Sequence, residues 1–171
     1  EAESLNYITL SGSGEPTSNI KIAEVIGEIK KITAVSIAVI TNASLLSAPL
    51  VRQELAAADL ILPSLDAVTQ EIFEQINRAE PAINIEDIIN GLVALRKEFR
   101  GKIWLEVMLV RQVNDDLRHI RKLKEVIDRI NPDKIQLNSP VRATAEANVF
   151  AVDKNKLEKI KEILGDKCEI I

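Results

Sequence analysis

Segments with the character of strands and of helices alternate along this chain, and this alternation restricts the fold more than any other feature. Strand-like runs rich in Val, Ile and Leu are separated by stretches with apolar residues at helical spacing. No hairpin turn joins consecutive strands, so the pattern predicts parallel strands connected by right-handed helical crossovers. Strands are expected at about residues 6–11, 35–41, 60–64, 103–110 and 135–138, and helices at about 18–32, from 47, 69–77, 85–100, 116–130 and 154–164.

The faces of the strands favour a partial (β/α) barrel over an open, doubly wound sheet. In the fourth strand, Leu105, Val107 and Leu109 share one face, while Glu106 lies on the other. A parallel sheet covered by helices on both faces would be apolar almost throughout. We therefore expect a partial TIM-like barrel of five parallel strands with outer helices, in which Glu106 points into the concave side.

Composition sets broad limits on function. The 171 residues suit one domain, carry a net charge of −4 and contain one cysteine, Cys168. The acidic balance argues against non-specific nucleic-acid binding by this segment. No apolar run approaches the ~20 residues of a membrane span, and a single cysteine fits a reducing compartment, so a cytoplasmic location is expected.

Polar residues gather where the predicted strands end, and in parallel α/β folds ligands bind at those ends. Turn and capping roles could explain each residue alone, but not Glu106 and Gln136, which lie inside strands. By contrast, His119 is expected on a solvated helix face, and Cys168 near a frayed C-terminus is expected to be inert. The candidate binding residues are Ser13, Gly14, Glu15, Asn42, Ser64, Asp66, Asn114, Gln136 and Asn138.

Several of these segments resemble, in order and spacing, the motifs of radical S-adenosylmethionine (SAM) enzymes. The resemblance covers about residues 5–145, and its nearest subgroup is the Fe–S oxidoreductases related to wybutosine-type tRNA-modifying enzymes. The matching segments are 11–16 (the GGE motif), 40–42 (TNG), 63–67 (SLD), 76–78 (INR), 106–115 (a strand with a GVND turn) and 131–138 (the last barrel strand).

The resemblance implies a cofactor pair and a division of the chain. In this family a CxxxCxxC loop after the first barrel strand holds a [4Fe–4S] cluster, which cleaves SAM to a 5′-deoxyadenosyl radical. By the resemblance, residues 1–145 are a radical-SAM-like barrel lacking its first βα unit, and residues 146–171 are a helical extension. The first strand and cluster loop are then expected upstream of Glu1, in a longer parent protein. With Cys168 alone, this chain is expected to hold no cluster and to be inactive by itself.

The resemblance also assigns roles to the candidate residues. Ala43 stands where the second motif has glycine, which disfavours a contact that needs a positive φ there. The implied SAM contacts are Ser13, Gly14 and Glu15 for the methionine amino end, Ser64 and Asp66 for the carboxylate or ribose, Asn114, Gln136 and Asn138 for the adenosine side, and Asn42 at the same mouth.

Two further expectations concern partners, and one alternative stays open. The subgroup points to a tRNA base as substrate. The missing strand would leave residues 7–10 as an exposed edge, prone to self-association or covered by a segment such as residues 169–171. The alternative function is a non-enzymatic α/β domain that binds a small molecule and never used a cluster.

Overall fold

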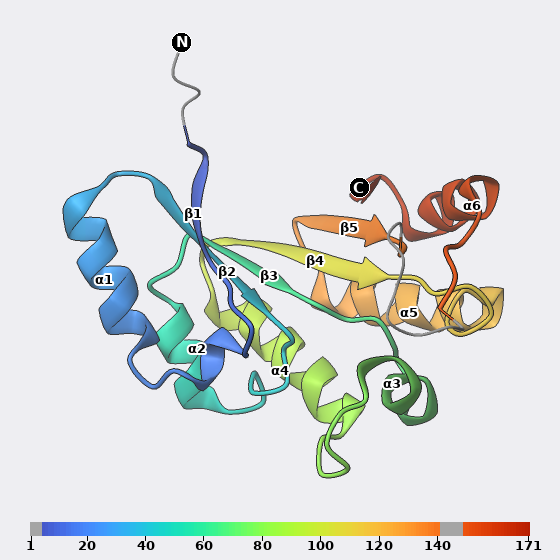
Figure 1. The fold of residues 1–171 in the computed structure, drawn as a ribbon, viewed down its shortest axis with the longest axis horizontal. Helices are drawn as coiled ribbons and strands as arrows, with labels where there is room; N and C mark the ends of the chain where they lie inside the picture. The colour runs from blue at the N-terminus through green and yellow to red at the C-terminus, as the bar shows by residue number, and fades with distance from the viewer. Residues whose placement is uncertain (1–4, 141–148) are drawn as a thin grey trace.

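A computed structural model describes residues 5–140 and 149–171, and it shows one curved sheet of parallel strands (Figure 1). The six strands lie side by side in chain order, each paired in parallel with the next. This arrangement confirms the predicted α/β class of parallel strands with outer helices. The strands are β1 (Tyr7–Leu10), β2 (Ser36–Thr41), β3 (Leu60–Pro63), β4 (Lys102–Met108), β5 (Lys134–Asn138) and β6 (Cys168–Ile170).

Helices α1, α2, α4 and α5 lie on the same side of the sheet in Figure 1. Three of the helices have side-chain N-caps, because Asn84, Asp116 and Asp153 accept hydrogen bonds from backbone N–H groups of the helices that follow. The helices are the 3-10 turn η1 (Pro16–Ser18), α1 (Ile22–Ile32), α2 (Pro49–Leu55), α3 (Gln70–Asn77), α4 (Ile85–Glu98), α5 (Leu117–Ile130) and α6 (Lys154–Leu164).

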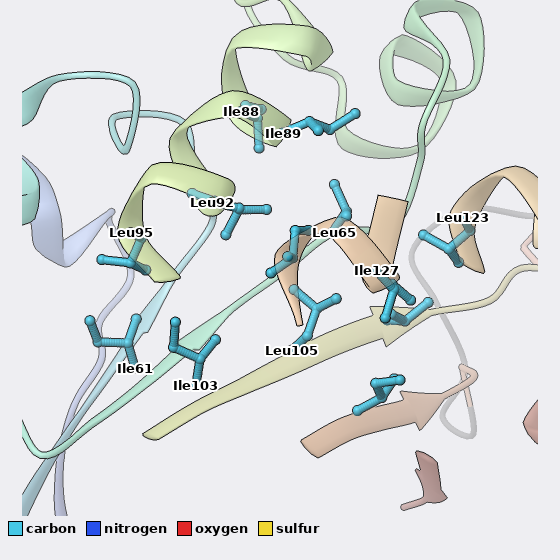
Figure 2. Close-up of a cluster of buried hydrophobic side chains, with 14 of the residues drawn as sticks. Ile61, Leu65, Ile88, Ile89, Leu92, Leu95, Ile103, Leu105, Leu123 and Ile127 are labelled. Atoms are coloured by element: carbon cyan, nitrogen blue, oxygen red, sulfur yellow. The ribbon is translucent and has the colours of Figure 1, made fainter. Parts of the chain in front are cut away.

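The main core lies between this helical layer and the face of the sheet that it covers. Figure 2 shows Ile61, Ile103 and Leu105 of the strands beneath Leu92 and Leu95 of α4, and all five side chains are fully buried. Each such side chain contributes roughly 1.5–3 kcal/mol to folding.

The other face of the sheet is concave, and several of its side chains are half-buried. Tyr7 of β1 and Trp104 of β4 meet edge to face with ring centroids 5.8 Å apart, although two strands lie between them. Strands are about 4.8 Å apart, so this contact requires the sheet to curve toward that face. Glu106 is half-buried there, while Leu105 and Val107 on either side of it are fully buried toward the helices. The predicted division of the two faces is confirmed.

The C-terminal segment differs from expectation. Residues 168–170 form β6, which pairs with β5 and therefore lies at the opposite edge of the sheet from β1. The suggestion that residues 169–171 cover the β1 edge is wrong, and Cys168 is buried in a strand rather than frayed. The predicted domain boundary between residues 145 and 146 lies outside the described residues.

Candidate functional site

A cavity of about 450 Å³ opens at the C-terminal ends of the first three strands. Its volume falls within the ~300–1,000 Å³ of small-molecule sites. Five of the nine candidate residues (Ser13, Gly14, Glu15, Asn42 and Ser64) line it. The complete lining is Ser11, Gly12, Ser13, Gly14, Glu15, Pro16, Ile40, Thr41, Asn42 and Ser64.

Gly14 lies in the exposed loop that forms one wall of this cavity. A Cβ built on Gly14 would meet no protein atom within 4 Å, and its backbone does not adopt the left-handed conformation. The packing of the described residues therefore does not require glycine here. Because glycine has no side chain, a polar ligand in the cavity could instead approach the main-chain groups of Gly14 closely.

Glu15 fastens this loop to the neighbouring strand. Its carboxylate accepts hydrogen bonds from Thr41 Oγ1 at 2.6 Å and from the Asn42 N–H at 2.7 Å. It also accepts from the Thr17 N–H at 3.0 Å and from Thr17 Oγ1 at 2.7 Å, which caps η1. Glu15 thus holds the walls from β1 and β2 together. Thr17 was not singled out in the sequence, and Thr41 was noted only within the 40–42 segment, because their role depends on where the Glu15 side chain turns.

Ala43 corrects an expectation drawn from the sequence. Its φ is +63°, so the left-handed conformation is present without glycine. Ala43 is fully buried, and its N–H donates to Thr41 Oγ1 at 3.1 Å, which fixes the turn. The cost of this conformation for a residue with a Cβ is roughly 1–2 kcal/mol, and the surrounding contacts offset it.

Asp66 lies below the rim rather than in the cavity lining. Its Oδ1 accepts from the Met108 N–H at 2.8 Å, and its Oδ2 accepts from Asn77 Nδ2 at 3.2 Å. Burial raises the pKa of Asp66; the two hydrogen bonds act in the opposite direction, and the negative charge of Glu106 adds to the rise. Asp66 therefore joins the end of β3 to β4.

Asn114 is also buried beneath the rim, and its side chain makes three hydrogen bonds there. Its Nδ2 donates to the carbonyl oxygens of Asp66 and Met108, both at 2.8 Å, and its Oδ1 accepts from the Val110 N–H at 2.7 Å. The side chain is fully buried. This geometry holds the loop after β4 in place.

Gln136 and Asn138 lie on the concave face of β5, apart from the lining of the cavity. They pair in register with Glu106 and Met108 of β4. Asn138 Nδ2 donates to Glu106 Oε1 at 2.8 Å, while Asn138 Oδ1 is buried without a partner in the part of the chain that the structure describes. The candidate residues are thus divided between a cavity, a buried layer and the concave face.

His119 is not on a solvated face, so that prediction is wrong. It is 5% exposed at the start of α5, and among the described residues neither ring nitrogen has a hydrogen-bond partner. Burial and the nearby charge of Lys122 lower the pKa of His119, while the main chain of Asp66 and the carboxylate of Asp116 oppose this. Helical periodicity alone did not show that the rim packs over this side of α5.

The residues present do not fit an iron–sulfur cluster. Within residues 5–140 and 149–171, no group of three or more His, Cys, Asp or Glu side chains could hold a metal. Cys168, the one cysteine, lies on β6 at the far edge of the sheet from β1. Burial raises the pKa of its thiol to about 11, so it is protonated near neutral pH.

Comparison with known families identifies the class of protein. The model of the radical SAM superfamily matches residues 2–124, which is well over half of the chain. The chain belongs to the radical SAM superfamily.

Relatives with similar sequences are longer than this chain. A protein named GTPase Obg from Brachyspira hyodysenteriae is 36% identical over 168 residues, covering 98% of this chain and 25% of that protein. A UPF0026 protein from Methanocaldococcus jannaschii is 31% identical over 169 residues, and one from Synechocystis is 38% identical over 138 residues. The first matches 99% of this chain and the second 81%. In both cases the matched region is 51% of the relative, so this chain spans about half of its length.

Solved structures share the fold at low sequence identity. A domain of pyruvate-formate lyase-activating enzyme from Bacteroides vulgatus aligns with a TM-score of 0.78 at 17% identity, over 95% of this chain and 97% of that one. SuiB from Streptococcus suis, solved bound to S-adenosylmethionine, aligns with a TM-score of 0.67 at 17% identity, over 96% of this chain and 39% of that one. No helix in the described residues is long and apolar enough to span a membrane.

Proposed function

We propose that this chain supplies the SAM-binding strand ends of a radical SAM enzyme. The observation that carries the proposal is the cavity of about 450 Å³ at the ends of β1–β3, within a chain of this superfamily. Its lining includes the exposed residues Ser11–Gly14 and the side chain of Asn42. Their carbonyl and hydroxyl oxygens would accept from the ammonium group of SAM, and their N–H and O–H groups would donate to its carboxylate and ribose. In the whole protein, SAM would be cleaved reductively at a [4Fe–4S] cluster to a 5′-deoxyadenosyl radical.

The residues of this chain would bind and orient the cofactor rather than carry the cluster. Glu15 would hold the loop of residues 11–14 against β2, with the two hydrogen bonds to Thr41 and Asn42. Ser64, at the end of β3, would close the third side of the cavity. Since these 171 residues contain one cysteine, the three thiolates of the cluster would come from elsewhere in the protein.

Calorimetric titration of the 171-residue chain with SAM tests this assignment. We expect saturable binding that Gly14→Val weakens at least tenfold, because the added side chain fills space beside the loop that the protein leaves open. Gly27→Val is the matched control, since a Cβ on Gly27 in α1 also meets no atom within 4 Å but lies outside the cavity lining. Absence of SAM binding, or equal binding by the Gly14 variant, would contradict the proposal.

Anaerobic treatment with iron and sulfide separates this role from that of a complete enzyme. The chain should stay colourless, because one buried thiol cannot hold a four-iron cluster. The full-length protein should form 5′-deoxyadenosine from SAM under reducing conditions, and Gly14→Val should lower that yield. A full-length protein that binds a small molecule but never assembles a cluster would instead support the non-enzymatic alternative.

For the whole protein we propose a cytoplasmic RNA base as substrate. Support comes from a similar protein of Nautilia profundicola named dual-specificity RNA methyltransferase RlmN, which is 34% identical over 74 residues, 43% of this chain and 21% of that protein. Incubating the full-length enzyme with total RNA and SAM, followed by nucleoside analysis, should show a modified base. An unchanged nucleoside profile despite SAM cleavage would contradict this substrate.

A further inference from the structure

The concave face of the sheet carries polar residues that the SAM cavity leaves unexplained. Ser64 bridges Glu106, which pairs in register with Gln136, which pairs in turn with Glu169. These four residues form one row across β4, β5, β6 and the end of β3. Only Ser64 also lines the cavity, so the row begins at the cavity and runs away from it along the concave face.

The row contains two carboxylates, Glu106 and Glu169, and only Glu169 has a cation beside it among the described residues. Glu106 Oε1 accepts from Asn138 Nδ2 at 2.8 Å, and in the described part of the chain Glu106 forms no ion pair. Lys134, on the same face of β5, is already engaged by Glu169 at 2.8 Å and lies over the Trp104 ring at 4.7 Å from its centroid. A half-buried carboxylate is costly without a positive or hydrogen-donating partner.

Two amide side chains beside this carboxylate have unused hydrogen-bonding capacity. Asn138 Oδ1 is buried and unpartnered, as noted above, and Gln136 makes no side-chain hydrogen bond to any described residue. The charge of Glu106 also contributes to the raised pKa of Asp66, so its negative field extends toward the rim. The group that would complete this site is one with N–H donors.

We propose that Glu106 and Gln136 bind an amidine or amine group of the molecule on which the enzyme acts. A planar amidine matches a carboxylate with two parallel N–H···O bonds, which is the stronger and more directional form of this contact. The bound group would lie beside Ser64, next to the proposed SAM cavity. This inference rests on the proposed function, because only a SAM-dependent reaction would place a substrate there.

Benzamidine serves as the probe, with benzoate as its oppositely charged counterpart. Trp104 is the single tryptophan and lies two residues from Glu106 on the same strand face, so its fluorescence reports on this site. Benzamidine should change that fluorescence saturably, and benzoate should not. Glu106→Gln should weaken benzamidine at least tenfold, whereas Glu158→Gln, an equal charge loss on the exposed face of α6, should leave it unchanged.

Further measurements make each outcome decisive. Should Glu106→Gln fail to fold, Gln136→Ala takes its place, with an expected weakening of at least threefold. An unresponsive wild type, or equal responses from wild type and the Glu106 variant, would overturn the inference. If SAM binding falls together with benzamidine binding in Glu106→Gln, the carboxylate belongs to the SAM site and the assignment is wrong. A wild-type protein that binds benzamidine but not SAM would instead overturn the proposed function.

Discussion

At the scale of single residues, two buried polar side chains beneath the rim differ in how the protein satisfies them. Asn114 makes three hydrogen bonds with neighbouring backbone groups. His119, nearly as buried, has no hydrogen-bond partner for either ring nitrogen among the described residues. Each buried unsatisfied group costs roughly 1–3 kcal/mol, so the two residues should contribute to stability with opposite sign.

His119→Leu should therefore stabilise the protein and change its response to pH. At pH 7 we expect a gain of about 1–2 kcal/mol in the free energy of unfolding, because an apolar side chain removes the unpaired nitrogens. Since burial lowers the pKa of His119 from its usual 6.5, the unfolded state binds more protons below that pH, and wild-type stability falls there. The leucine variant should lack this component of the fall.

Urea unfolding of both proteins between pH 5 and 8 gives the measurement. Asp66, whose pKa is raised, acts with the opposite sign, since protonation on acidification relieves its burial cost. That contribution is common to both proteins, so the difference between them isolates His119. A constant difference across this range would contradict the role assigned to the histidine.

For residues at and below the rim, the structure shows contacts that the sequence motifs do not specify. Glu15 and Asp66 were assigned to the SAM site through motifs, and the structure shows each engaged with backbone N–H groups of a neighbouring strand. A carboxylate at a strand end has the same sequence signature whether it binds a ligand or another strand. Which of the two it does depends on where its side chain turns.

At the scale of elements, α4 and the loop after β2 approach each other closely at Gly91. A Cβ on Gly91 would come within 2.6 Å of Leu46 C and 2.7 Å of Ser47 N, both backbone atoms. Arg52 of α2 strengthens the same junction, since it donates to the Leu46 carbonyl at 2.7 Å and pairs with Glu98 of α4 at 2.8 Å. Glycine at position 91 therefore sets the distance between helix and loop.

Two glycine-to-alanine variants should change stability in opposite directions. Gly91→Ala should lose about 3 kcal/mol, because the backbone atoms it meets cannot rotate away. Gly27→Ala, in α1 with free space around it, should gain about 0.5–1 kcal/mol from helix propensity. Urea midpoints that move in the same direction for both variants would show that the contact at Gly91 is not limiting.

The elements predicted well are those with a strong period. β4 and α5 were recognised because their apolar residues repeat at two and at 3.6 residues. β6 was missed as a sheet strand because three residues carry too little pattern, and its partner β5 lies some 30 residues earlier in the chain. Pairing at that distance follows from the completed sheet rather than from local sequence.

At the scale of the whole molecule, the sheet has two edge strands in the part that the structure describes. β6 pairs only with β5, and β1 pairs only with β2. A groove of about 370 Å³ runs beside β1, lined in part by Thr9, Leu10 and Val25. Two apolar side chains near β1 in the sequence are exposed: Leu5, two residues before the strand, is 73% exposed, and Ile20, next to the groove residue Asn19, is 88% exposed.

An open strand edge beside exposed apolar side chains is a pairing site, so we expect the 171-residue chain to self-associate through β1. A symmetric dimer would join two β1 strands antiparallel and continue the sheet across the contact. Sedimentation velocity over a range of concentrations should show reversible dimers.

Val25→Lys, which places a charge in the groove, should shift the protein to monomer, because a buried, unpaired ammonium opposes the contact. Leu50→Lys is the matched control, since Leu50 is 73% exposed on α2 and outside the groove. A monomeric wild type at high concentration would refute association through this edge, and dimers that survive Val25→Lys but not Leu50→Lys would place the interface on α2 instead.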